Sequence, residues 1–396
     1  MNAEKDKPAE GLLPYYMRHN ISPVHYQFDS IEAHFDRRDS LYRSLGLPPL
    51  AFRNHRVLEV AAGSGQNSLY VASCLPQTYD LVEPNTAGIL DIRKTYEGYA
   101  GRHTPPTLHE VQFEDYKANE GYDVVICENW LGSMPHDLAA IGKLASLVKP
   151  GGALVVTCVP VSGFFANTMR KLLALRLTDP ARSFNQNTES LVGIFSPHLA
   201  TIRDMTRNHR DWVQDTMLLP AYLDIALPFE TANHAVGGGM EFLASFPSFA
   251  PDWRWFKSLV GERRRFIEHM LEFYRMNLHN FIDHRKTWPT RAADDNARLE
   301  TAFKSLHHTA LALQATGTAH DRNASLPFIE EISEHLSVLA GELGKIDKDT
   351  AATVAELKSV WDHPAMDATI VRDMRLFASL FGRETVYVSF TRARSI

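Results

Sequence analysis

The sequence has few cysteines and no long hydrophobic run, and each absence excludes a class of protein. Its 396 residues contain only Cys74, Cys127 and Cys158, none of which stands in a Cys-x-x-Cys pair. This spacing favours neither a disulfide framework nor a zinc site, so we expect no metal. No stretch reaches the roughly 20 apolar residues of a membrane span, and the polar N-terminus has no apolar segment typical of a secretory signal. We therefore expect a cytoplasmic protein with buried, reduced thiols.

A strong excess of charge is also missing. The formal net charge is −6, which disfavours a nucleic acid or a membrane surface as partner, although a local basic patch is compatible with such an average. We expect a small-molecule partner, no nucleic acid and no membrane. The length predicts one large domain or two fused domains.

Short apolar segments alternate with helical ones over the first 160 residues. Strands are predicted at residues 56–60, 78–83, 108–111, 122–128 and 153–159. Helices are predicted between them at residues 67–74, 86–99 and 137–148, after an earlier helix at 30–45. This alternation predicts parallel βαβ units with right-handed crossovers.

The second half of the chain is predicted to be mostly helical. The predicted helices cover residues 164–175, 189–216 (broken near Pro197), 266–281, 297–315, 327–343, 351–361 and 368–380. Strands are expected at 240–246 and at 384–391, where β-branched residues alternate with others. A strand after a long helical block indicates that the block is an insertion and that the C-terminus returns to the first sheet.

These patterns predict an α/β fold: a Rossmann-like, mostly parallel seven-stranded sheet with a large helical insertion before the last strand. The expected domains are an N-terminal helical cap at 1–50, a cofactor-binding domain at 51–250, a helical insertion at 251–382 and a returning strand at 383–396.

The first strand ends in a turn of small residues, LEVAAGSGQ at positions 58–66. Glycines there let the backbone approach a ligand, and the next helix offers unpaired N–H groups at its N-terminus. Glu83 ends the following strand, where a carboxylate can accept hydrogen bonds from two ribose hydroxyls. Together these features favour an adenosine-containing ligand.

The identity of that ligand depends on position 68. A dinucleotide fingerprint needs a third glycine there, and this chain has Ser68. Residues 56–157 instead resemble the class I methyltransferase family. Its first motif, an acidic residue followed by small residues and glycines, is matched by residues 59–65, with Ala61 in place of the commonest first glycine. Further matches are residues 113–115, 122–128 and 147–152, with 384–391 as the expected seventh strand.

The resemblance implies S-adenosylmethionine as cofactor and S-adenosylhomocysteine as product. The cofactor-binding positions it implies are Glu59, Ala61, Gly63, Ser64, Gly65, Glu83, Asn85, Glu114, Asp115, Glu128 and Asn129. Backbone amides of residues 63–65 would face the methionine part, Glu83 the ribose, and Glu114 or Asp115 the adenine. Residues 128–131 would pass the sulfonium. Glu59 either contacts the cofactor or orders the glycine turn, and both readings stay open.

Methyl transfer from a sulfonium is an in-line displacement that needs alignment and exclusion of water. A general base is required only if the acceptor arrives protonated. The candidates are Glu128, His136, His209, Asp211 and His234. His136 is preferred because it follows the fourth strand. Arg210 and Arg254 lie in clusters of polar and aromatic residues at 208–215 and 251–256. They either grip an acidic group of the acceptor or belong to turns whose tryptophans pack into the core.

The leading hypothesis is therefore a methyltransferase acting at oxygen or nitrogen of a metabolite or sugar-like compound. Residues 41–49 and 252–256 resemble bacterial methyltransferases associated with glycan or secondary-metabolite clusters. The helical insertion would shape the acceptor pocket or form a homodimer interface. The alternatives are a nicotinamide-dependent dehydrogenase and a non-catalytic scaffold that binds S-adenosylmethionine.

Overall fold

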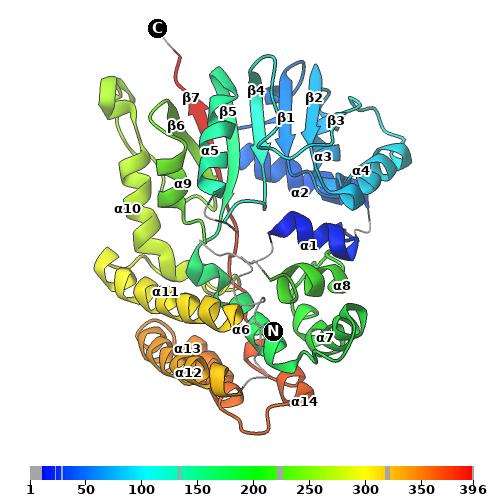
Figure 1. Cartoon of the computed structure of the whole chain (residues 1–396). Coiled ribbons are helices and arrows are strands. Elements are labelled where there is room, and N and C mark those ends of the chain that lie inside the picture. The colour runs from blue at the N-terminus through cyan, green and yellow to red at the C-terminus, as the bar shows by residue number, and fades with distance from the viewer. Residues whose placement is uncertain are drawn as a thin grey trace. The chain divides into compact units, whose positions relative to one another are not determined.

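The structure is a computed structural model that describes residues 11–22, 24–27, 30–132, 134, 136–220, 226–316 and 322–394, with side chains from 325 onward in the last range. The chain divides into two compact units (Figure 1). Unit 1 contains Pro160–Tyr222 and Tyr274–Glu384, and unit 2 contains Glu10–Val159, Leu223–Phe273 and Thr385–Ile396.

Unit 2 is built on a seven-stranded sheet. Its strands are β1 (Arg56–Val60), β2 (Thr78–Val82), β3 (Thr107–His109), β4 (Tyr122–Cys127), β5 (Val148–Cys158), β6 (Met240–Phe246) and β7 (Val386–Arg392). They lie in the order β3-β2-β1-β4-β5-β7-β6. Neighbours from β3 to β5 are parallel, and β7 runs antiparallel to both β5 and β6. The expected α/β fold class, Rossmann-like with a mostly parallel sheet, is confirmed.

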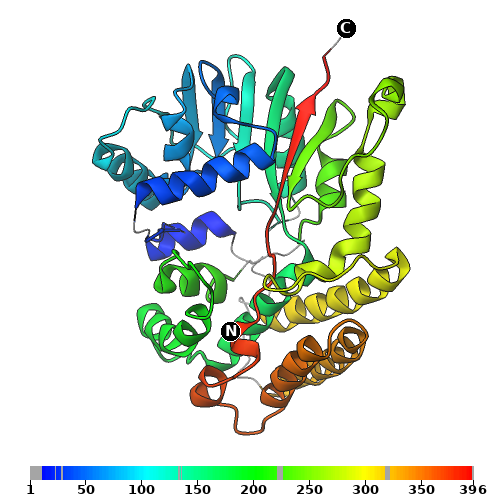
Figure 2. The ribbon, with the colours of Figure 1, turned by 180° about the vertical axis from the view of Figure 1, so that it is seen from behind.

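The central strands form because most of their residues are apolar. Four of the five residues of β1 are buried, and β4 and β5 end in buried runs, as expected for parallel strands covered on both faces. The helices of unit 2 are α1 (Leu12–His19), α2 (Ile31–Ser44), α3 (Gln66–Ser73), α4 (Thr86–Gly98), α5 (Asp137–Ser146) and α9 (Phe229–Ala235), and α10 (Ile267–Asn277) begins there. Side chains of α2, α3 and α4 share one core with the sheet, with α2 lying across that face (Figure 2).

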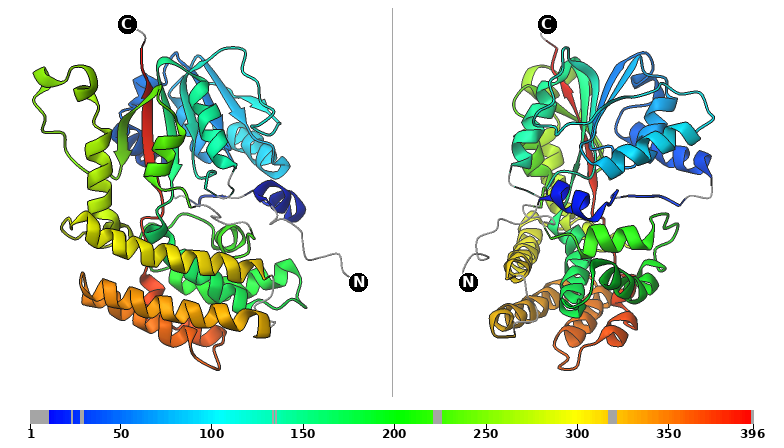
Figure 3. Two further views of the ribbon diagram at one scale, coloured as in Figure 1. Left: turned by 60° about the vertical axis from the view of Figure 1, so that its left-hand side comes forward. Right: turned by 45° about the vertical axis from the view of Figure 1, so that its right-hand side comes forward.

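Unit 1 is helical. It contains α6 (Val161–Leu177), α7 (Phe184–Leu199), α8 (His209–Trp212), α11 (Ala293–Ala315), α12 (Arg322–Gly344), α13 (Lys348–Trp361) and α14 (Ala368–Arg372). Helices α11, α12 and α13 pack side by side (Figure 3). The core between the helices holds large apolar side chains such as Phe165, Phe195, Phe303 and Trp361.

The compact units differ from the domains expected from sequence. Residues 160–222 were expected in the cofactor-binding domain, but they belong to unit 1, because α6 and α7 bury their apolar faces in the helical core. The helix expected at 368–380 ends at Arg372, since the carbonyl oxygens of Phe377, Ala378 and Leu380 accept hydrogen bonds from the buried Arg170 guanidinium. Pro197 lies inside α7, which ends at Leu199, and the next helix begins only at His209, so the break expected near Pro197 within residues 189–216 is confirmed.

The predictions drawn from the missing features can be compared with the described residues. Cys74, Cys127 and Cys158 are free and buried. Within the described ranges, no three histidine, cysteine, aspartate or glutamate side chains are grouped as metal ligands. Among the helices described, none combines the length and apolar character needed to cross a membrane.

Trp361 is a large, fully buried side chain in the core of unit 1. Its Nε1–H donates to the Ile329 carbonyl at 3.0 Å, and the Arg176 guanidinium lies 4.5 Å from its ring centroid. We expect Trp361→Ala to lower the free energy of unfolding by about 3–5 kcal/mol, because it leaves a large cavity. The urea midpoint followed by circular dichroism measures this. Exposed Val338→Ala on α12 is the control and should stay within about 0.5 kcal/mol; equal effects would contradict the assignment.

Candidate functional site

The turn after β1 meets the end of β2. Ala61, Gly63 and Gly65 have φ of 62°, 58° and 75°, so the chain turns sharply before α3. The Gly63 N–H donates to Glu83 Oε2 at 2.9 Å. Parallel pairing in register, with Val60 opposite Val82, brings both strands to the same sheet edge and makes this contact possible. The left-handed φ of Ala61 explains why glycine is the usual residue at that position.

Among the residues that the structure describes, Glu83 accepts hydrogen bonds from two backbone N–H groups and from no side chain. Its Oε1 accepts from the Asn85 N–H at 2.9 Å, while Oε2 accepts from Gly63. Burial raises the pKa of Glu83 to about 6, although both N–H groups act to lower it. The Asn85 side chain caps α4 by accepting from the Ala87 N–H at 3.2 Å, and it donates to the Ile21 carbonyl at 2.8 Å.

Glu59 points into the core behind the turn. Its carboxylate accepts hydrogen bonds from the Ser68 hydroxyl at 2.8 Å and from the Tyr79 hydroxyl. Burial, together with the nearby Glu128 charge, raises the pKa of Glu59 to about 7. Of the two roles left open by the sequence, these contacts support ordering of the turn, because Ser68 lies on the helix that the turn feeds. Ser68, which stands where a dinucleotide fingerprint has glycine, thus donates a hydrogen bond to Glu59, the acidic residue of the first motif.

Glu128, at the end of β4, is bound to two side chains of α2. Arg38 Nη2 lies 2.7 and 2.8 Å from its two oxygens, and the Tyr42 hydroxyl donates to Oε1 at 2.8 Å. Both members of the ion pair are more than nine-tenths buried. Burial and the Glu128 charge also raise the pKa of Tyr42. A carboxylate engaged by a guanidinium and a phenol is poorly suited to the base role expected for it.

Neighbouring groups complete this end of the sheet. Asn129 has a φ of 55°, and its N–H donates to Thr157 Oγ1 at 2.7 Å. Tyr387 on β7 hydrogen-bonds the Asn129 side chain, and burial followed by the Glu128 charge raises the pKa of Tyr387. Sequence reasoning missed Arg38, Tyr42 and Tyr387. The spacing of Arg38 and Tyr42, four residues apart on a predicted helix, was the only available signal.

The remaining predicted residues lie in several places. Ser64 is buried, and its carbonyl accepts from Thr95 Oγ1 at 3.0 Å. Glu114 and Asp115 are exposed in the loop after β3, whose last residue, His109, accepts from the Glu83 N–H. His136 is exposed at the start of α5, with Nε2 3.7 Å from Asp137 Oδ1. His209 belongs to unit 1, where its Nδ1 lies 3.0 Å from Ser196 Oγ.

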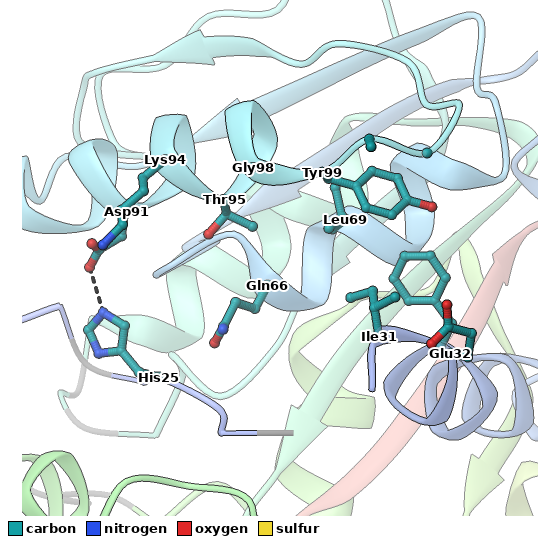
Figure 4. A pocket seen from close by; sticks show the side chains of 13 residues that line it. His25, Ile31, Glu32, Gln66, Leu69, Asp91, Lys94, Thr95, Gly98 and Tyr99 are labelled. Atoms are coloured by element: carbon teal, nitrogen blue, oxygen red, sulfur yellow. Dashed lines mark hydrogen bonds and ion pairs between the residues drawn. The ribbon is translucent and has the colours of Figure 1, made fainter. Parts of the chain in front are cut away.

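A cavity of about 790 Å³ lies beside the turn (Figure 4). It is lined by α2, α3 and α4 and by the segment before α2. His25 pairs with Asp91 at 2.7 Å on one side of it, and Ile31, Leu69 and Tyr99 stand on the other (Figure 4). Neither Gly63 nor Glu83 lines this cavity, so it is distinct from the predicted cofactor site.

Comparison with known families gives one match to the segment that contains the turn. Residues 33–190 match the family model of the methyltransferase domain. This segment is therefore similar to a methyltransferase domain.

Solved structures resemble the chain only in part. The magnesium protoporphyrin IX methyltransferase of Synechocystis is 20% identical, with a TM-score of 0.30, over 38% of this chain and 74% of that one. The N-methyltransferase NodS of Bradyrhizobium japonicum is 17% identical (TM-score 0.26; 32% and 62%). DesVI of Streptomyces venezuelae is 21% identical (TM-score 0.25; 32% and 50%), so the likeness spans half of that protein. A comparison with curated protein sequences gives no match.

The residues at the turn fit the cofactor chemically. A carboxylate offers about four lone-pair positions, and the two N–H groups bonded to Glu83 use two of them. Two positions remain for ribose hydroxyls. The left-handed glycines at 63 and 65 keep the backbone free of side chains where a ligand would approach.

Gly88 on α4 allows the helix to pass close to the turn. A Cβ atom there would lie 2.9 Å from the Gly63 carbonyl oxygen and 3.5 Å from Glu83 Cδ. We expect Gly88→Ala to displace the turn and so weaken binding of S-adenosylhomocysteine, because the added Cβ overpacks the contact between helix and turn. Calorimetric titration measures the change. Gly98→Ala, at a position of the same helix with no described atom near its Cβ, should bind normally. Unchanged binding by Gly88→Ala would remove this constraint.

Arg38 forms an ion pair with the buried Glu128 carboxylate. Among the described residues of unit 2, no other cation pairs with that carboxylate at this distance. We expect Arg38→Met to lower the free energy of unfolding by about 3–5 kcal/mol, because Glu128 is left without its cation. The double variant Arg38→Met/Glu128→Met should recover most of that loss. Urea denaturation measures both, with exposed Arg37→Met as control. A double variant as unstable as the single one would show that the pair is not the cause.

Proposed function

We propose that this protein transfers a methyl group from S-adenosylmethionine to oxygen or nitrogen of a small-molecule acceptor, a metabolite or sugar-like compound. The observation that carries the proposal is the Gly63–Glu83 contact, which lies within the segment that matches the methyltransferase domain. It joins the glycine turn to the acid that would accept the ribose hydroxyls.

The cofactor supplies a methyl group on a positively charged sulfur, and the protein would align it and exclude water. In our proposal the backbone of residues 63–65 faces the methionine part, Glu83 binds the ribose, and Asn85 holds Glu83 in place. Glu59 stabilises the turn from behind. Glu114 or Asp115 meets the adenine, and Asn129 lies at the end of β4, where the reacting centre would sit.

The Arg38–Glu128 ion pair would position the elements around the site and would not take part in the reaction. Its contacts tie α2 to the end of β4, next to Asn129, whose side chain is hydrogen-bonded to Tyr387. If the acceptor arrives as a protonated hydroxyl, we propose His136 as base, because it is exposed and follows the same strand. His209 is the second candidate. A cytoplasmic location is part of the same proposal. So is a homodimer through the insertion expected at residues 251–382, with its helices rather than residues 251–265 forming the contact.

The alternatives are less well supported. In a dehydrogenase, position 68 would hold the third glycine, but here the Ser68 hydroxyl is bonded to Glu59. Titration calorimetry with S-adenosylhomocysteine and with NAD separates these two enzymes, and binding to NAD alone would contradict the proposal. Transfer of label from methyl-labelled S-adenosylmethionine into a metabolite extract separates an enzyme from a scaffold and identifies the acceptor.

Glu83 gives a quantitative test of the cofactor site. We expect Glu83→Ala to weaken binding of S-adenosylhomocysteine by roughly 1–3 kcal/mol, because a charged hydrogen-bond acceptor is lost. Since the pKa of Glu83 is about 6, its carboxyl gains a proton as the pH falls below that value and then accepts fewer hydrogen bonds. Binding should therefore weaken on acidification below pH 6.

The control for this test is Glu83→Gln, which cannot titrate and should bind weakly with little dependence on pH. Exposed Glu110→Ala, one strand away, should bind as the parent does. Equal affinity of parent and Glu83→Ala at neutral pH would exclude Glu83 from the site.

A further inference from the structure

Residues 251–265, which we call the aromatic loop, connect β6 to α10 and project beyond the edge strand of unit 2 (Figures 1 and 3). Trp253 is 89% exposed, Trp255 65% and Phe256 68%, and Val260 is exposed as well. The interpretation that these tryptophans pack into the core is therefore wrong. Four large apolar side chains on eight consecutive residues form a patch rather than scattered exposure, and such patches mark interaction sites.

The aromatic loop is basic although the chain is acidic. It contains five basic and two acidic residues, a net charge of +3, whereas the whole chain carries −6. Lys257 Nζ lies 5.8 Å from the Trp255 ring centroid and 5.9 Å from that of Phe256, so positive charge stands beside the exposed rings. The chain-wide average therefore conceals a local basic patch.

Internal hydrogen bonds hold the aromatic loop in shape. The Arg254 guanidinium pairs with Asp252, with Nη2 2.6 Å from Oδ2. Its Nη1 donates to the carbonyls of Arg263 and Arg265 at 2.8 and 2.7 Å, and the group stacks on the Phe266 ring. Arg264 pairs with Glu241 on β6. Arg254 is thus not available for an acceptor, and its contacts fix a loop that points its aromatic residues outward.

We propose that the aromatic loop docks on the surface of a membrane that contains anionic lipids. Tryptophan and phenylalanine rings favour the interface between headgroups and hydrocarbon, and adjacent lysines and arginines are attracted to anionic headgroups. The proposal replaces the expectation of no membrane partner, which rested on the average charge. It does not depend on the proposed function.

A second copy of the chain fits the patch less well. A stable protein interface takes about 20–30 residues from each side. The aromatic loop has 15 residues, and several of its polar groups are already bonded internally. A loop that inserts a few rings and places cations at the headgroups needs no such area.

The test is co-sedimentation of the full chain with vesicles of phosphatidylcholine alone or of phosphatidylcholine with phosphatidylglycerol. We expect binding to the anionic vesicles that weakens with added salt. Trp253→Ser/Trp255→Ser/Phe256→Ser should lower the partition coefficient by roughly tenfold or more, because the inserted apolar area is lost. Lys257→Glu/Arg263→Glu should abolish the preference for anionic vesicles. Leu50→Ser/Leu90→Ser, which removes exposed apolar side chains elsewhere in unit 2, is the matched control.

Because the three aromatic side chains are exposed, the triple variant should keep the parent's urea midpoint and its affinity for S-adenosylhomocysteine. The proposal is overturned if the parent binds neither type of vesicle, or if the triple variant sediments with them as the parent does. It is also overturned if analytical ultracentrifugation without lipid finds a dimer that the triple variant dissociates, since the occupant would then be a second copy.

Discussion

The hydrogen bond from the Gly63 N–H to Glu83 is the constraint around which this sheet edge is organised. It requires β1 and β2 to be parallel and in register, a left-handed turn after β1, and a helix α4 that passes without a side chain at position 88. Desolvation of the carboxyl opposes the arrangement, as its raised pKa of about 6 records. The backbone donors of Gly63 and Asn85 offset part of that cost, and the acid is left with acceptor capacity for a ligand.

Three buried glutamates share this edge, and each is stabilised differently. Glu83 has two backbone N–H groups, Glu59 has two hydroxyls, and Glu128 has a guanidinium and a phenol. Only Glu128 is paired with a full positive charge. Burial, together with the nearby Glu128 charge, raises the pKa of Glu59 to about 7. Differences of this kind arise when similar groups occupy unlike environments.

Much of the fold could be predicted because its signals are local. Mostly apolar runs indicated β1, β4 and β5. The residue that ends a parallel strand must lie at the common edge of the sheet, which placed Glu83 beside the glycine turn. The course of residues 160–222 could not be predicted, because their apolar helical faces fit equally well against a sheet or against other helices. The Arg38–Glu128 pair could not be predicted either, because it joins residues 90 positions apart. The pattern of α2 indicates a helix but does not indicate which polar residue on it is buried.

Two arginines show how the distance of a partner along the chain decides what a residue does. Arg254 finds its carboxylate two residues away in Asp252, so the pair closes a local loop and leaves the neighbouring tryptophans outside any core. Arg38 finds its carboxylate on another element, so the pair fastens a helix to a strand and is buried with it. In the sequence both look like charged residues near aromatic ones. The structural consequence is opposite. A guanidinium whose partner is close in the chain can pair at the surface, whereas one whose partner lies on another buried element is buried together with it.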